Sequence, residues 1–299
     1  MLHRRIPRWH QCGIFSIWLV WATLWLPQVR GQIPPDLILP KSKTTSLQLS
    51  GPSTANITIL GLRVAFEPDV NLSTTGDGQF LMSPDSSRCD GFLVDPPPHD
   101  ADYFLAQLEA VANYYERVTR EQVTFDLMGS LVFPPQGHEP ILLNRMATYR
   151  PVSEEDSTDI LLVRLFEESM LAAVDSGLDV FDYDIAVVFH AGLGQDFTYP
   201  FLDPTPLDIP SAAIDPEMIQ AALGTSGIPI PVGDDLYDLY DRPGIILPEG
   251  QNHIYYDIVE DIFPGGSDYC DVQIGLTGTF ALLMGYALGL SPLFDTDDG

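Results

Sequence analysis

The sequence predicts a mixed α/β (α+β) domain in which helices pack on a twisted mixed β-sheet. Three segments carry this prediction. Residues 56–66 (NITILGLRVAF) have the β-branched enrichment of a strand. Apolar residues recur at helical spacing after Asp100. Residues 184–190 (DIAVVFH) hold five consecutive apolar residues, as expected for a strand that is buried on both faces.

The first half of the chain gives clear signals for the remaining elements. Asp100 can cap a helix, whose apolar face would then hold Phe104, Leu108, Val111 and Tyr115. Residues 123–133 predict one or two strands. Residues 153–156 (SEED) resemble a capping box, so we expect the second helix to begin there and to end at Gly177.

The second half of the chain is harder to interpret. Residues 191–250 are rich in Pro, Asp and Gly and show little periodicity, apart from a short helix over residues 216–223. We therefore expect a long loop, of the kind that is commonly functional. A further strand is expected over residues 254–259, followed by the uncharged stretch 272–294.

The amino terminus has the plan of a secretory signal peptide. Residues 1–13 are short and basic, residues 14–26 are a thirteen-residue apolar run, and Gly31 supplies a small residue for cleavage. We expect a signal peptide over residues 1–31, a linker over 32–52 and one domain over 53–299, secreted or at the cell surface. An uncleaved amino-terminal anchor is the alternative.

The charge of the chain excludes one class of partner. The chain carries 42 acidic and 14 basic side chains, and the first 31 residues hold four of the arginines and no carboxylate. Without that stretch the net charge is −32, which repels phosphate backbones and anionic lipid. We expect no nucleic-acid partner and no membrane contact beyond the signal peptide.

Few residues could form a disulfide or hold a metal ion. Without the signal peptide, the cysteines are Cys89 and Cys270, which could form a disulfide after export or remain thiols. None of the histidines at 99, 138, 190 and 253 lies at ligand spacing from another, so we expect surface or core roles for them. Two acidic stretches could bind calcium or form a solvated surface, and their candidate ligands are Asp234, Asp235, Asp295 and Asp297.

The carboxyl-terminal stretch resembles a known family. Residues 285–299 (GYALGLSPLFDTDDG) look like the end of the active-site helix in the immune inhibitor A-like secreted metallopeptidases, whose pattern is close to HEFGHxLGLPDLYDTD. Residues 106–118, 183–192 and 202–211 resemble other parts of that family in the same order. The resemblance implies a metzincin-like core with a backing helix and an active-site helix, zinc as the cofactor, and polypeptide as the substrate.

The residues that would bind zinc in this family are missing here. The resemblance places Leu282 and Leu283 at the first zinc histidine and the catalytic glutamate, Tyr286 at the second histidine, and Pro292 at the third ligand. Leucine and proline have no donor atoms, and a phenol is a poor substitute for imidazole. We expect no zinc cofactor, although calcium binding stays open.

The helix that carries these positions is expected to be apolar all round. Because residues four apart share a helix face, Leu282 and Tyr286 should form an apolar floor where the family has its metal. Gly285 and Gly289, which shape this helix and its exit turn in the family, are retained. A membrane span over residues 272–294, with these glycines as a packing pair, is the competing interpretation.

The sequence therefore favours a pseudopeptidase, a metallopeptidase-like domain that has lost zinc and proteolysis and binds polypeptide in its cleft. The cleft candidates are His190, at the end of a predicted strand, and Gly192 and Asp196, which follow it. One alternative is an active zinc endopeptidase whose ligands come from elsewhere, such as His190, His253 and an aspartate. Another is a structural or membrane-anchored module of the cell surface. Because the family domain continues beyond this helix, the resemblance also implies a domain that is incomplete at its carboxyl end.

Overall fold

The computed structural model describes residues 55–83, 94–151, 157–197, 205–251 and 274–290. All of them belong to one compact unit, Pro34–Gly299. The expected strand over residues 254–259 lies outside the described residues.

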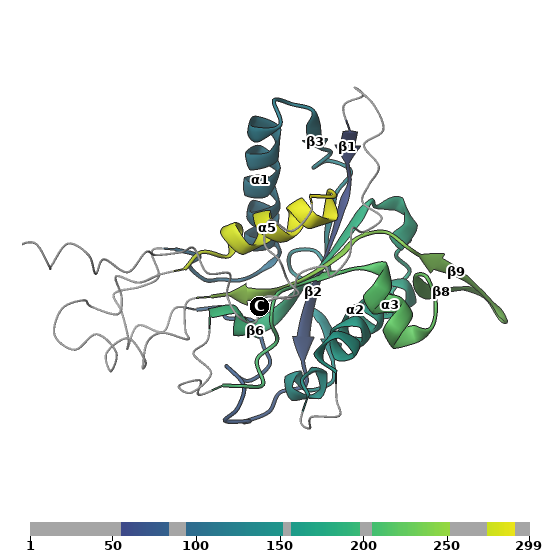
Figure 1. The fold of residues 1–299 in the computed structure, drawn as a ribbon. Coiled ribbons are helices and arrows are strands. Elements are labelled where there is room, and N and C mark those ends of the chain that lie inside the picture. The colour runs from purple at the N-terminus through teal and green to yellow at the C-terminus, as the bar shows by residue number, and fades with distance from the viewer. Residues whose placement is uncertain (1–54, 84–93, 152–156, 198–204, 252–273, 291–299) are drawn as a thin grey trace, which may run out of the picture. The chain divides into compact units, whose positions relative to one another are not determined.

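The centre of the fold is a mixed sheet with the strand order β4-β2-β6-β10-β7, in which β5 also pairs with β2 (Figure 1). Its neighbours pair in parallel, except that β7 runs antiparallel to β10 at one edge. The prediction of a mixed α/β fold on a mixed sheet is therefore confirmed. The strands are Ile59–Phe66 (β2), Leu131–Phe133 (β4), Ile141–Leu143 (β5), Ile185–Leu193 (β6), Ala212–Ile214 (β7) and Gly244–Gly250 (β10).

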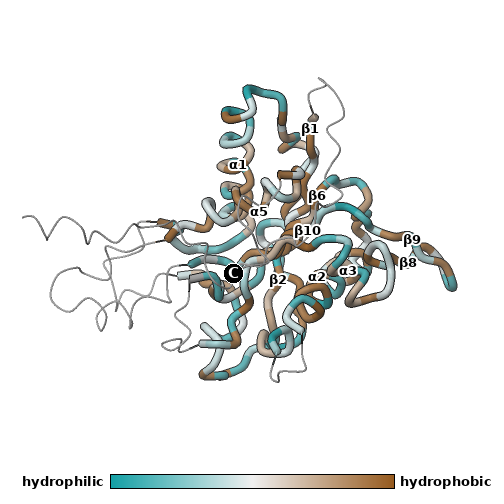
Figure 2. The backbone as a smooth tube through the Cα atoms, in the orientation of Figure 1, coloured by the Kyte–Doolittle hydropathy of each residue, from teal (hydrophilic) through white to brown (hydrophobic). Residues whose placement is uncertain are grey.

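The three central strands β2, β6 and β10 are buried along their whole length. Figure 2 shows hydrophobic residues along β6 and β10. Such continuous burial requires cover on both faces of the sheet. Figure 1 shows α1 and α5 on one side of these strands and α2 and α3 on the other. Phe189 of β6 stacks on Phe104 of α1 and meets Phe280 of α5 edge-on.

Helix α1 (Ala101–Val118) forms as the sequence predicts. Asp100 is its N-cap, and its carboxylate accepts a hydrogen bond from the Tyr103 backbone N–H at 3.1 Å. The predicted apolar face is buried. Beside this helix, β1 (Ala55–Ile57) and β3 (Val123–Phe125) form a separate two-stranded parallel sheet.

Helix α2 (Thr158–Asp175) begins later than predicted. Its N-cap residue is Ser157, whose backbone is extended, so a helix that runs on from a capping box at residue 153 is wrong. Residues 153–156 themselves lie outside the described part of the chain. The predicted end is confirmed, since Gly177 has a φ of +88° and closes the helix in the left-handed conformation that glycine tolerates.

The expected loop over residues 191–250 is wrong, because most of its described part is regular structure. It holds the end of β6, β7, helix α3 (Pro216–Leu223, as predicted), a hairpin of β8 (Ile228–Gly233) and β9 (Leu236–Tyr240), and β10. The prolines at 229 and 231 hid the hairpin, because proline within an apolar run argues against a strand unless that strand lies at an edge. Short 3-10 helices cover Met146–Tyr149, Val180–Asp182 and Gln195–Phe197.

Helix α5 (Leu276–Ala287) follows β10 in the described chain and packs against α1, β7 and β10. Among the described residues, no helix is both long and apolar enough to cross a membrane. Gly289, with a φ of +93°, forms the exit turn of α5, in which the Leu290 N–H bonds the Gly285 carbonyl.

Candidate functional site

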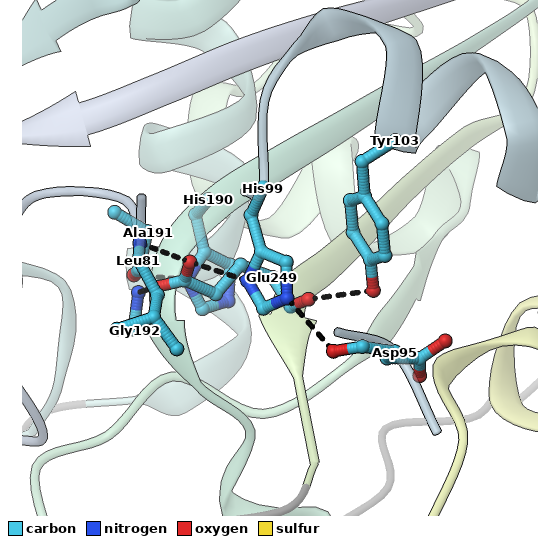
Figure 3. A network of polar contacts seen from close by, with 8 residues as sticks. All are labelled: Leu81, Asp95, His99, Tyr103, His190, Ala191, Gly192 and Glu249. Carbon is cyan, nitrogen blue, oxygen red and sulfur yellow. Dashed lines mark hydrogen bonds and ion pairs between the residues drawn. The ribbon is translucent and has the colours of Figure 1, made fainter. Parts of the chain in front are cut away.

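The carboxyl ends of the three central strands meet at one edge of the sheet. The register pairs Val64 of β2 with His190 of β6, and His190 with Pro248 of β10. The residues that follow these partners therefore lie close together at the carboxyl ends of the strands. Open α/β sheets usually place their functional groups there. A buried polar network fills this edge (Figure 3).

Glu249 of β10 is the centre of the network. Its side-chain Oε2 accepts a hydrogen bond from the Leu81 N–H at 2.7 Å and lies 2.8 Å from Nδ1 of His99. Its Oε1 accepts a bond from the Gly192 N–H at 2.7 Å. Three donors thus satisfy a carboxylate whose side chain is only 5% exposed, as burial of a charge requires.

His99 and Glu249 form a buried hydrogen-bonded pair, which is an ion pair when the ring is protonated. The second ring nitrogen of His99, Nε2, lies 3.1 Å from the Asp95 carbonyl oxygen, so both nitrogens face acceptors and the doubly protonated ring fits the site. Burial by itself lowers the pKa of His99, but the hydrogen bond and charge of Glu249, with the Asp95 carbonyl, outweigh it and raise that pKa above its usual value.

Tyr103 holds the pair from the side of α1. Its ring stacks on His99 with the centroids 4.4 Å apart, and its hydroxyl donates a hydrogen bond to the Glu249 backbone carbonyl at 3.0 Å. Burial, followed by the charges of Asp95 and Glu249, raises the pKa of Tyr103 far above its usual value. The phenol therefore stays a neutral donor.

His190 lies in the same layer but carries no charge. Its Nδ1 is 2.9 Å from the Ala191 carbonyl oxygen, so the single ring proton fits on this nitrogen. The other nitrogen, Nε2, is fully buried and makes no hydrogen bond of regular geometry to the described residues. Burial lowers the pKa of His190 to about 4, because water cannot solvate the charged ring there.

The other two cleft candidates, Gly192 and Asp196, are also buried. Gly192 donates its N–H to Glu249, and its φ of +88° and the closeness of the Met146 methyl exclude a larger residue. The Asp196 carboxylate accepts bonds from the Ser211 N–H at 2.6 Å, the Ser211 hydroxyl at 2.5 Å and the Gln251 amide.

The structure therefore brings His190, Gly192 and Asp196 to one edge of the sheet. All three are buried there, and in the described part of the chain they belong to packing and hydrogen-bond networks. Asp208 has the same kind of role, because its carboxylate accepts bonds from both the N–H and the hydroxyl of Thr75. These two carboxylates fix loops to the sheet edge.

The acidic candidates for calcium binding do not form a described site. Asp234 and Asp235 are exposed at the turn between β8 and β9. In the part of the chain that the structure describes, no three His, Cys, Asp or Glu side chains are grouped to hold a metal ion. The remaining candidates lie outside the described residues, namely Cys89, His253, Cys270, Pro292, Asp295 and Asp297.

The three described residues of α5 that the sequence resemblance aligns with the zinc site differ in their surroundings. Leu282 is 39% exposed, whereas Leu283 is fully buried and Tyr286 is 7% exposed. The expected floor of Leu282 and Tyr286 is thus wrong, because the core of the fold takes up Leu283 and Tyr286 and leaves Leu282 at the surface. Burial also raises the pKa of Tyr286, which keeps its phenol neutral. This donor set does not fit zinc.

The space beside Tyr286 is small. A cavity of ≈ 20 Å³ is lined by residues that include Asp215, Arg242, Gly244 and Tyr286, and it has room for about one water molecule. One oxygen of the buried Asp215 carboxylate, Oδ2, has no hydrogen-bond partner in the described structure, while Oδ1 caps α3. The described part of this region therefore has no room for a substrate chain.

The two glycines near the ends of α5 allow a matched test of how it packs. A Cβ on Gly285 would lie 2.7 Å from the hydroxyl of Tyr115, which is itself fixed by a 2.6 Å bond to the Ala281 carbonyl. We expect Gly285→Ala to lower the free energy of unfolding by about 1 to 3 kcal/mol through overpacking. Gly278 has open space, so Gly278→Ala should raise that free energy by about 0.5 to 1 kcal/mol. Urea denaturation measures both, and equal effects at the two positions would contradict this packing.

Sequence reasoning missed Glu249 and His99, the central pair of the site. A signal was present, because residues 244–249 form a short apolar run that ends in a carboxylate, just as residues 184–190 end in His190. His99 directly precedes the helix cap Asp100. The sequence does not show that these two residues, 150 positions apart, are in contact.

Neither the family models nor the curated proteins yield a match to this sequence.

Proposed function

We propose that this chain is an exported, non-catalytic domain built like the immune inhibitor A-like metallopeptidases, which binds polypeptide without cutting it. The observation that carries the proposal is the composition and burial of α5. The positions that correspond to zinc ligands and the catalytic base hold Leu282, Leu283 and Tyr286, two of which belong to the hydrophobic core.

The topology supports the proposed scaffold. A mixed sheet with one antiparallel edge strand, a backing helix on one face, and a helix that follows the last strand agrees with the metzincin-like core that the resemblance implies. The two retained glycines support it as well. Gly285 allows α5 to approach Tyr115 closely, and Gly289 forms the exit turn.

The chemistry of the site argues against zinc-dependent hydrolysis. A zinc peptidase needs three protein ligands and a base that takes a proton from the attacking water. Leucine side chains supply neither function, and a neutral, buried phenol is a poor metal ligand. The carboxylates and imidazoles at the sheet edge are already engaged with one another or fully buried.

Metal content and proteolysis together test this proposal. We expect the full chain, purified and dialysed against zinc, to retain no stoichiometric zinc, to leave unfolded casein intact, and to bind immobilised casein. The same chain with an added metal chelator is the control. Its casein binding should equal that of the untreated chain. Stoichiometric zinc together with cleavage that the chelator stops would overturn the proposal in favour of a peptidase with ligands from elsewhere.

A further inference from the structure

The β8–β9 hairpin extends away from the main sheet and pairs with no other described strand (Figure 1). Its base is anchored, because Ile228, Ile230 and Tyr240 are buried. Residues 231–238 are exposed throughout. The hairpin therefore presents two strand edges beyond its base, and an unpaired edge is a template for another strand.

Prolines block one of these edges. The register pairs Ile228 with Tyr240 and Ile230 with Asp238, while Pro229 and Pro231 face Leu239 and Tyr237. Proline cannot donate a hydrogen bond, so the ladder bonds between the strands belong to the two isoleucine pairs. The outer edge of β8 accordingly presents Pro229 and Pro231, which have no N–H to offer another strand.

The outer edge of β9 keeps its donors. Because the isoleucine pairs carry the ladder, the backbone groups of Tyr237 and Leu239 point away from β8. The Leu239 N–H bonds the carboxylate of its own neighbour Asp238 at 2.9 Å, and this bond is exposed. The Asp238 carboxylate thus occupies a backbone donor at this edge. An incoming basic side chain could draw the carboxylate away and free that donor.

The side chains of the hairpin combine apolar and acidic character. Leu236 and Tyr237 are 70% and 60% exposed, and Val232 of β8 is exposed beside them. Residues 228–241 hold four aspartates and no basic residue, namely Asp234, Asp235, Asp238 and Asp241. This composition favours a partner strand that carries both apolar and positively charged residues.

We propose that the outer edge of β9 binds an extended polypeptide segment in which basic and apolar residues alternate, and that the segment adds to the hairpin as a third strand. The inference rests on the proposed function and specifies where polypeptide docks and of what composition. A basic side chain opposite Asp238 draws its carboxylate away, which frees the Leu239 N–H for a main-chain bond. Apolar residues of the segment pack on Tyr237 and Leu239.

Charge excludes a second copy of this chain as the occupant. Two hairpins that paired edge to edge would bring four aspartates against four, and like charges across neighbouring strands are destabilising. The whole chain carries a net charge of −28, so the same repulsion acts at longer range.

Fluorescence anisotropy with the full chain tests the docking edge. The probes are a labelled ten-residue peptide of alternating lysine and valine and its glutamate–valine counterpart, at about 0.15 M salt so that distant charges are screened. We expect the lysine peptide to bind and the glutamate peptide to bind at least about tenfold more weakly, since reversal turns each attractive cross-strand pair into a repulsive one.

Matched variants locate the peptide on β9. Tyr237→Pro removes an outward N–H and should weaken binding about tenfold, whereas Tyr237→Thr keeps the N–H and should weaken it less than about threefold. Asp238→Asn should weaken binding about threefold, whereas Asp102→Asn, an exposed aspartate on α1, should leave it unchanged. If Tyr237→Pro lowers the melting temperature, its loss of binding could come from an unfolded hairpin. The comparison of Asp238→Asn with Asp102→Asn then decides whether the peptide binds at β9.

The outcomes separate this inference from the proposed function. If the lysine peptide binds equally to the parent, Tyr237→Pro and Asp238→Asn chains, the docking edge is wrong and polypeptide binding stands. If the glutamate peptide binds as tightly as the lysine peptide, the charge argument fails. If the parent binds neither peptide nor casein, the proposed binding function fails and this inference fails with it.

Discussion

Glu249→Gln is expected to lower the free energy of unfolding by about 3 to 5 kcal/mol, the usual cost of breaking a buried ion pair by changing one partner. The amide has nearly the shape of the carboxylate, so no cavity forms. The amide does, however, place an NH2 donor where the carboxylate has an acceptor oxygen. Both oxygens of Glu249 face N–H groups, so the new donor would face another donor. The substitution also leaves the charge of His99 without a counter-charge. Chemical denaturation at about pH 6, below the unfolded pKa of His99, measures the loss.

The pH dependence of this loss of stability tests whether His99 is the charged partner of Glu249. The pKa of His99 is raised in the folded chain, so its pairing stabilises the fold fully below the unfolded pKa of about 6.5. That stabilisation is lost as the pH rises through the folded pKa. The difference in the free energy of unfolding between the parent chain and Glu249→Gln should therefore become smaller at alkaline pH. Glu217→Gln, at an exposed glutamate of α3, is the control and should change the free energy by less than about 0.5 kcal/mol. A pH-independent difference would argue against the ion pair.

His190 should make the fold sensitive to acid. Its pKa is about 4 in the folded chain and about 6.5 in the unfolded chain, so only the unfolded chain takes up a proton between these values. Stability is therefore lost as the pH falls from 6.5 towards 4. The expected loss from this residue between pH 7 and pH 4 is about 3 kcal/mol, from 1.36 kcal/mol for each pKa unit.

A variant without the ring isolates this contribution from the many carboxylates that titrate in the same range. His190→Leu keeps the volume of the side chain approximately and removes the titration. Urea denaturation at pH 7 and pH 4.5 should show the variant losing about 2 kcal/mol less than the parent between these conditions. If both chains lose the same amount, His190 is not held neutral by burial.

The parts of the fold that were predicted correctly are those in which local signals are sufficient. Helix α1 has a capping residue and an apolar stripe within 18 residues, and β6 is buried on both faces and reads as an unbroken apolar run. The segment 191–250 failed because its strands are short or contain proline. Strand β7 has three residues, and β8 is tolerated as a strand because the backbone nitrogens of its prolines face away from β9.

The candidate site shows why the polar network was not predictable. His99, Gly192 and Leu81 each lie far from Glu249 in sequence, and only the parallel order of β2, β6 and β10 brings the segments that bear them to one edge. Helical spacing likewise placed Leu282 and Tyr286 on one face of α5. It could not show that the elements packed on α5 cover Tyr286 and leave Leu282 exposed, since that depends on tertiary contacts.

The single carboxylate of Glu249 also has a mechanical consequence. It is the shared acceptor for the amides of Leu81 and Gly192, which belong to a loop and to a strand more than a hundred residues apart. Neither amide can be released to solvent without disturbing the acceptor of the other. We therefore expect the loop, the start of α1 and the ends of β6 and β10 to open together as one cooperative unit.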